Sequence, residues 1–122
     1  RSLEGLLAGL REPAESREFR LKIAGEDFRA AGQAVLDSLA GYAKEQPGWS
    51  IAPDNCEGVR VDLDRAHGDG WFLLRLSLHD PILPLNIESD REHGARTIAR
   101  QLAPFLARQT ILDASSVLEF TL

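Results

Sequence analysis

Several polar side chains gather where an apolar segment of this chain ends in a turn. Residues 71–81 read WFLLRLSLHDP, and alternation along a strand places Arg75 and Ser77 on one face. A guanidinium presents a planar fork of donors that matches phosphate oxygens, and a serine hydroxyl and turn amides supply further donors. The pattern therefore suggests a phosphate-binding loop. The alternative is a plain turn, with Arg75 paired to a surface carboxylate.

The order of features around this turn points to a known family. From Asn55 the chain reads NCEGVRVDLD, a glycine-rich turn, WFLLRLSLHDP, ILPLNIES and then a helical pattern. This order resembles the C-terminal domain of the phosphomannomutase/phosphoglucomutase (phosphohexomutase) family. In that domain a DGVR strand, a strand ending in RPSGTEP or RxSNTEP, another strand and a closing helix follow one another. The resemblance covers about residues 13–108.

The resemblance implies that Arg75, Ser77, Leu78 and His79 bind a substrate phosphate. Arg75, Ser77 and Pro81 stand where the family has Arg, Ser and Pro. Leu78 replaces a Gly or Asn and is bulkier than glycine. His79 replaces a Thr and keeps a donor, on a ring that can titrate near neutral pH.

The resemblance also implies what the whole protein does. We expect this domain to bind the non-transferring phosphate of mannose or glucose 1- or 6-phosphate, and to close over the cleft during intramolecular phosphoryl transfer. The preceding domains of the same chain would supply the phosphoserine and Mg²⁺. No cofactor and no catalytic residue are therefore expected here, and the isolated domain is expected to be inactive. The sequence does not distinguish mannose from glucose phosphate. The alternative is a stand-alone α+β ligand-sensing or protein-interaction module without catalysis.

Hydrophobic periodicity predicts an α+β fold in the order β-α-β-β-β-α. Strands are expected at 19–23, 58–64, 71–77 and 82–88, and helices at 26–45 and 90–107. About four antiparallel strands would be covered on one face by the two helices, which the resemblance implies is a TBP-like fold.

Local signals refine the second half of this prediction. Pro84 is expected to make its strand an edge or a bulge. Ser89 and Glu92 have the spacing of a capping box at the start of the last helix. The buried stripe of that helix is predicted to be Ile98, Leu102, Phe105 and Leu106. In the tail, residues 110–122, the segment 117–122 is expected to be an added strand or an ordered extension.

Length and composition fit one small domain. Of the 122 residues, 1–15 are expected to be a junction to a preceding domain and 16–122 the domain itself. Within the junction, 3–10 has a short helical pattern, and the polar stretch 11–18 suits a hinge. A net charge of −5 argues against partners such as nucleic acid or an anionic membrane. With Cys56 alone no internal disulfide is possible, which favours the cytoplasm.

The remaining acidic and basic residues and the histidines are not expected to form a functional site. Asp62 and Asp64 alternate with apolar residues, so we expect them on the wet face of a strand and not at a Mg²⁺ site. The histidines have no spacing that makes a zinc site. Arg96 and Arg100 lie one helical turn apart, opposite the apolar stripe, and are expected to face solvent or to form salt bridges. No metal site is expected in this chain.

Overall fold

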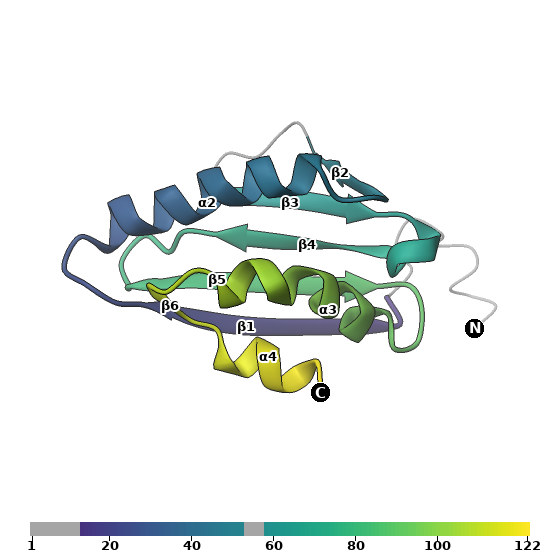
Figure 1. The fold of residues 1–122 in the computed structure, drawn as a ribbon. Coiled ribbons are helices and arrows are strands. Elements are labelled where there is room, and N and C mark those ends of the chain that lie inside the picture. The colour runs from purple at the N-terminus through teal and green to yellow at the C-terminus, as the bar shows by residue number, and fades with distance from the viewer. Residues whose placement is uncertain (1–12, 53–57) are drawn as a thin grey trace.

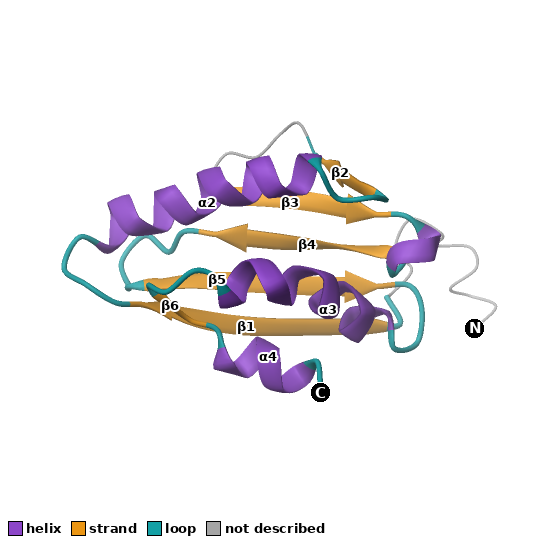
Figure 2. Ribbon diagram, in the orientation of Figure 1, coloured by secondary structure: helices purple, strands orange, loops and turns teal. Residues whose placement is uncertain are grey.

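A computed structural model of the protein describes residues 13–52 and 58–122. Its elements are β1 (Glu15–Ile23), α2 (Phe28–Lys44), β2 (Trp49–Ile51), β3 (Gly58–Leu63), the 3-10 helix η2 (Arg65–His67), β4 (Gly70–Arg75), β5 (Ile82–Ser89), α3 (Gly94–Ala107), β6 (Leu112–Asp113) and α4 (Ser115–Phe120). Within these residues the strands form one antiparallel sheet in the order β2-β3-β4-β5-β1-β6. Helices α2 and α3 lie on one face of it, and α4 lies beside β1 (Figure 1, Figure 2).

The core lies between the sheet and these two helices. Alternate strand residues, among them Leu21, Val61, Phe72 and Leu85, are fully buried on the helical face. The predicted stripe of α3 is confirmed, since Ile98, Leu102, Phe105 and Leu106 are all buried. The α+β class and the antiparallel sheet are thus confirmed, while β2, β6 and α4 are additions to the predicted order.

Strand β5 lies in the middle of the sheet, so the expectation of an edge or a bulge at Pro84 is wrong. Pro84 pairs with Arg20 of β1, whereas the ladder with β4 reaches only as far as Leu85, the residue after Pro84. The carbonyl of Ile82 accepts from Ser77 N on the β4 side, and backbone alternation turns the nitrogen of Pro84 to the same side. Proline has no N–H to donate, and at position 84 this N–H would point to a part of the β4 side that lies beyond the end of the β4–β5 ladder.

The predicted capping box is also wrong, because Ser89 belongs to the sheet. Ser89 is the last residue of β5 and is 1% exposed. Its hydroxyl donates to the carbonyl of Gly68 at 2.6 Å and accepts from the amide of Arg91 at 3.0 Å. Helix α3 begins only at Gly94, so Ser89 fastens the end of β5 to the turn after η2.

The cap of α3 comes from β1 instead. The carboxylate of Glu15 accepts from His93 N at 2.8 Å and from Ala95 N at 3.1 Å. Burial alone would raise the pKa of Glu15, but these two hydrogen bonds and the nearby charges of Arg17 and His93 lower it below its usual value. The carboxylate therefore supplies acceptors and a favourable charge to the first turn of α3.

We expect Glu15→Gln to lower the free energy of unfolding by about 0.5–1 kcal/mol at pH 7, because it removes this charge. Since the folded state lowers the pKa, the contribution of Glu15 is complete above the unfolded value of about 4.3 and is lost as the pH falls through the folded value. Urea denaturation from pH 7 to pH 3 should show the two proteins converging at low pH. Glu18→Gln, an exposed change in the same strand, is the control, and a constant gap at all pH values would contradict the assignment.

The proposed hinge at 11–18 is wrong in part. Residues 15–18 belong to β1 and pair with 86–89 of β5, because their backbone completes the sheet although their side chains are polar. The predicted helix at 3–10, Asn55 and Cys56 lie outside the described residues. No helix in the described ranges is long and apolar enough to cross a bilayer.

The tail adds a helix where a strand or extension was expected. β6 pairs with β1, and α4 follows. Arg96 and Arg100 of α3 donate through Nε to the carbonyls of Phe120 and Thr121, at 3.2 and 2.9 Å. Exposed as they are, these arginines bind the last turn of the chain and form no salt bridge with any described residue.

Candidate functional site

The loop between β4 and β5 is held by its own hydrogen bonds. Ser77 N donates to the carbonyl of Ile82 at 3.3 Å, and Ile82 N donates to the carbonyl of Asp80 at 2.7 Å. Asp80 N donates to the hydroxyl oxygen of Ser77 at 3.3 Å. β4 ends at Arg75, two residues earlier than predicted, and these bonds turn the following residues back into β5.

Neighbouring elements anchor the loop from outside. Leu76 packs against α2 at Gly32. A Cβ added to Gly32 would lie 2.6 Å from Cδ1 of Leu76. The carbonyl of Pro81 accepts from Ile23 N of β1 at 2.8 Å. Arg29, in the first turn of α2, donates to the carbonyl of Leu78 at 2.6 Å. The loop thus has a set conformation before any ligand arrives.

Arg29 is a residue that sequence reasoning missed. The helix dipole disfavours a positive charge in the first turn of a helix. A basic residue in that turn is therefore a sign that its side chain binds a group outside the helix. Here that partner is the carbonyl of Leu78, 49 residues further along the chain, which no local pattern reveals.

The loop leaves three donors without an acceptor among the described residues. They are the hydroxyl hydrogen of Ser77, whose oxygen accepts from Asp80, and the backbone amides of Leu78 and His79. All three belong to consecutive residues, and the last two residues are exposed. Consecutive free amides of this kind form anion-binding concavities in other loops.

Arg75 lies at the edge of this loop on the face of the sheet opposite the helices. It alternates with the buried Leu74 and is itself partly buried, and its side chain forms no ion pair or hydrogen bond with any described residue. The alternative in which Arg75 pairs with a surface carboxylate therefore finds no support in the described part of the chain. Its guanidinium remains available to a ligand.

Close backbone packing sets the position of Arg75. Gly58 of β3 is its cross-strand partner, and an added Cβ at Gly58 would lie 2.4 Å from the carbonyl oxygen of Leu74 and 2.7 Å from Cβ of Arg75. Glycine thus lets β3 approach β4 at this point. Across β5 in the same row lies Arg20, two strand spacings or about 10 Å away.

Acidic groups keep this end of the molecule from being strongly positive. Asp80 lies in the loop, and Asp27 caps α2 by accepting from Ala30 N at 3.3 Å. An anion here would be held by directed donors and by Arg75 more than by a general positive field.

Known proteins are similar to this chain over part or most of its length. No family model matches the chain. A protein named probable phosphoglucosamine mutase, from Methanopyrus kandleri, is 34% identical over 55 residues, or 45% of this chain and 11% of that protein. The crystal structure of a phosphoglucomutase/phosphomannomutase family protein from Burkholderia thailandensis has the same fold, with a TM-score of 0.60 and 22% identity over 87% of this chain and 20% of that one. The first match is a likeness in sequence over less than half of this chain, and the second shows a shared fold.

The chain spans only about a tenth of the first relative and a fifth of the second. By their names, the first is a probable phosphoglucosamine mutase and the second is a member of a phosphoglucomutase/phosphomannomutase family. The fold likeness covers more of this chain than the 55 residues of sequence similarity.

The other candidate residues in the described part of the chain do not cluster as metal ligands. No group of three or more His, Cys, Asp or Glu side chains that could hold a metal ion occurs in the described ranges. Asp62 is exposed as predicted and pairs with Arg60 of the same strand at 3.3 Å. Asp64 contacts His67 through a hydrogen bond of 2.6 Å, and His93 is exposed at the start of α3.

Proposed function

We propose that this chain is the phosphate-binding C-terminal domain of a cytoplasmic phosphohexomutase, and that its loop holds the non-transferring phosphate of a hexose phosphate. Arg75 supplies the charge and a bidentate fork, Ser77 donates its hydroxyl hydrogen, and Leu78 and His79 donate their amides. The exposed imidazole of His79 adds a further N–H donor.

The observation that carries the proposal is the set of consecutive free donors beside a free arginine. The donors of residues 77–79 belong to one loop with a set conformation, and Arg75 is the last residue of the strand before it, so little ordering is needed when the phosphate binds. A phosphate held at one end of the sugar supplies binding energy remote from the reacting centre, which positions the other end for transfer.

The chemistry itself belongs to other parts of such an enzyme. We place the phosphoserine and Mg²⁺ in the preceding domains, and we infer that this domain closes over the cleft when phosphohexose binds, which excludes water from the transfer. The loop contacts only phosphate, so it serves whichever sugar carbon bears that group. Glucose, mannose and glucosamine phosphates therefore all remain candidate substrates.

A titration of the ¹⁵N-labelled chain tests the proposal. Glucose 6-phosphate at up to about 20 mM should shift the amide signals of Leu78 and His79, because a phosphate oxygen would accept from them. Glucose alone should leave these signals in place, and Arg75→Ala should remove the shifts. If glucose 6-phosphate left the signals of residues 75–80 unmoved, or if glucose shifted them equally, the loop would not be a phosphate site.

A further inference from the structure

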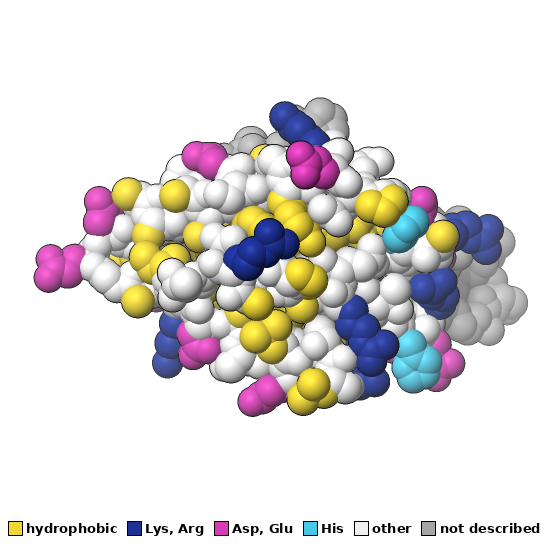
Figure 3. Space-filling model, in the orientation of Figure 1, with side chains coloured by type: hydrophobic (Ala, Val, Ile, Leu, Met, Phe, Trp, Pro, Cys, Tyr) yellow, Lys and Arg dark blue, Asp and Glu magenta, His cyan; other side chains and the backbone are white. Residues whose placement is uncertain are grey.

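Arg29 contacts the loop between β4 and β5 through one backbone carbonyl. The Nη2 atom of its guanidinium donates to the carbonyl oxygen of Leu78 at 2.6 Å. Arg29 forms no ion pair with any described carboxylate, although Glu26 and Asp27 directly precede α2. Figure 3 shows acidic side chains at this end of the molecule, where α2 begins. The partner of Arg29 is therefore the backbone of the loop and not an acidic side chain.

The contact with Leu78 also sets the direction of the next amide. The carbonyl of Leu78 and the N–H of His79 belong to one peptide unit, which is planar. No peptide bond in the described ranges is cis, and in a trans unit the C=O and N–H bonds point in opposite directions. Because the carbonyl of Leu78 is turned toward Arg29 in α2, the N–H of His79 points away from α2.

A second contact shows which side of the loop faces the helix. Leu76 packs on Gly32, which lies one turn after Arg29 on the same face of α2, so the loop meets α2 at two points. Helix α2 covers one face of the sheet (Figure 1), and Arg75 lies on the opposite face. The N–H of His79 is thus turned away from the helices, as Arg75 is, and it has no acceptor among the described residues.

We propose that Arg29 is a positioning residue of the phosphate site, which turns the N–H of His79 toward the phosphate without touching the phosphate itself. This inference rests on the proposed function. A cation bound to the carbonyl of Leu78 also polarises the peptide unit and makes its N–H a stronger donor. Leu78 and His79 are exposed, so without Arg29 their peptide unit can rotate. Only the molecules with this N–H turned outward then bind phosphate in full.

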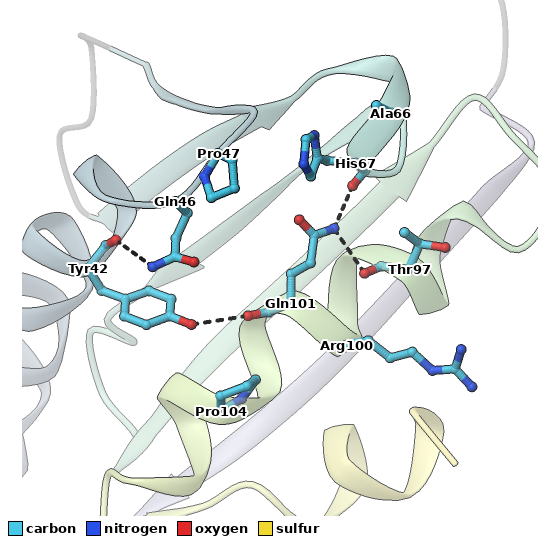
Figure 4. Close-up of a pocket in the computed structure, with 9 residues that line it drawn as sticks. All are labelled: Tyr42, Gln46, Pro47, Ala66, His67, Thr97, Arg100, Gln101 and Pro104. Carbon is cyan, nitrogen blue, oxygen red and sulfur yellow. Dashed lines mark hydrogen bonds between the residues drawn. The ribbon is translucent and has the colours of Figure 1, made fainter.

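Another concavity of the fold shows the opposite pattern. A cleft of about 520 Å³ lies between α2 and α3, at the end of α2 far from the loop (Figure 4). In this cleft the side chain of Gln101 donates to the carbonyls of His67 at 2.6 Å and Thr97 at 3.0 Å. The backbone carbonyl of Gln101 accepts from the hydroxyl of Tyr42 at 3.4 Å. These groups are already bonded within the protein, so the cleft serves as a reference region for the loop.

Nuclear magnetic resonance of the ligand-free, ¹³C- and ¹⁵N-labelled chain tests the hold of Arg29 on the loop. The amide of His79 should have an order parameter near about 0.85, typical of rigid backbone, and Arg29→Met should lower it below about 0.6. The carbonyl ¹³C signal of Leu78 should move in the same variant. Arg29→Lys should preserve both, because an ammonium group also donates to a carbonyl. The signals of Tyr42 and Gln101 in the cleft should not change in either variant.

Titration with glucose 6-phosphate tests the consequence for binding. Arg29→Met should raise the Kd about five- to tenfold, the rise expected when the binding-competent orientation falls to about a fifth or a tenth of the molecules. Arg29→Lys should stay within about twofold of the unmodified chain, unlike Arg75→Lys, because a carbonyl needs a donor and not a planar fork.

Lys44→Met is the matched control. It removes the same charge from the last turn of the same helix, about 22 Å from Arg29 along the axis, and it should leave the Kd within about twofold. Urea denaturation should show Arg29→Met to be about as stable as the unmodified chain, because the helix dipole disfavours the cation that is removed. A loss of binding would then not come from unfolding.

The outcomes distinguish this inference from the proposed function. If the unmodified chain binds glucose 6-phosphate, an unchanged Kd in Arg29→Met or an equal loss in Lys44→Met would overturn the positioning role. An unchanged order parameter of His79 in Arg29→Met would overturn it as well. No binding to the unmodified chain would instead overturn the phosphate site, while the ligand-free signals of Leu78 and His79 would still show whether Arg29 holds their peptide unit.

Discussion

Arg75→Ala, made in the protein that contains this chain, is expected to lower kcat/KM for a hexose phosphate by about 30- to 1000-fold. This range corresponds to the 2–4 kcal/mol that is typically lost when a charged partner of a bound anion is removed. The side chain of Arg75 has no intramolecular partner among the described residues, so its loss leaves no unpaired group in the free protein. The whole effect should therefore fall on the substrate complex, with KM rising more than kcat falls.

Two further variants sharpen this experiment. Arg75→Lys should recover only part of the activity, because a point charge does not reproduce the planar fork. Arg60→Ala is the matched control, since Arg60 lies on the next strand but is already paired with Asp62 and stacked 4.3 Å from the ring centroid of Trp71. It should stay within about twofold of the unmodified protein. Unchanged steady-state kinetics in Arg75→Ala, with the circular dichroism spectrum intact, would show that this loop is only a turn.

Gly94→Ala is expected to destabilise the fold by about 2–3 kcal/mol, as overpacking of a tight contact does. A Cβ added to Gly94 would lie 1.8 Å from the hydroxyl oxygen of Ser89 and 2.7 Å from the carbonyl oxygen of Gly68. Ser89 is buried and bonded to that same carbonyl. It has no room to move aside, so α3 would have to shift away from the end of β5.

Gly41→Ala is the control for that change. Gly41 also lies in a helix, but an added Cβ there meets nothing within 4 Å. Alanine should stabilise this position by about 0.5–1 kcal/mol, because it restricts the unfolded chain. Urea denaturation of both variants gives the comparison. If the two changes had effects of the same sign, the close packing of Gly94 against Ser89 would be refuted.

The sequence by itself determined the strands and helices in which apolar residues recur at a regular spacing. Alternation at Leu21 and Ile23 predicted β1, and three- and four-residue steps predicted α2 and the buried stripe of α3. Both patterns are local, since one face of an element must be apolar for it to pack at all. The loop residues, too, were recognisable as donors by their chemistry and by their order in the chain.

The tertiary structure alone decided which element lies beside which. Pro84 is typical of an edge strand, yet β5 lies inside the sheet. The sheet tolerates Pro84 there because the ladder between β5 and β4 stops at Leu85, so an N–H at position 84 is not required. Ser89 reads as a helix cap, yet Glu15, about 80 residues away, caps α3. Such pairings depend on long-range contacts that no window of sequence contains.

The same division holds for the candidate site. Arg75, Ser77, Leu78 and His79 could be selected from the sequence, but whether they are free could not, because a donor is free only when no other part of the fold satisfies it. The anchor at Arg29 illustrates this, since its acceptor is the carbonyl of Leu78. The chain specifies which groups can bind phosphate, and the packing of α2 and β1 around the loop decides which of them remain unpaired.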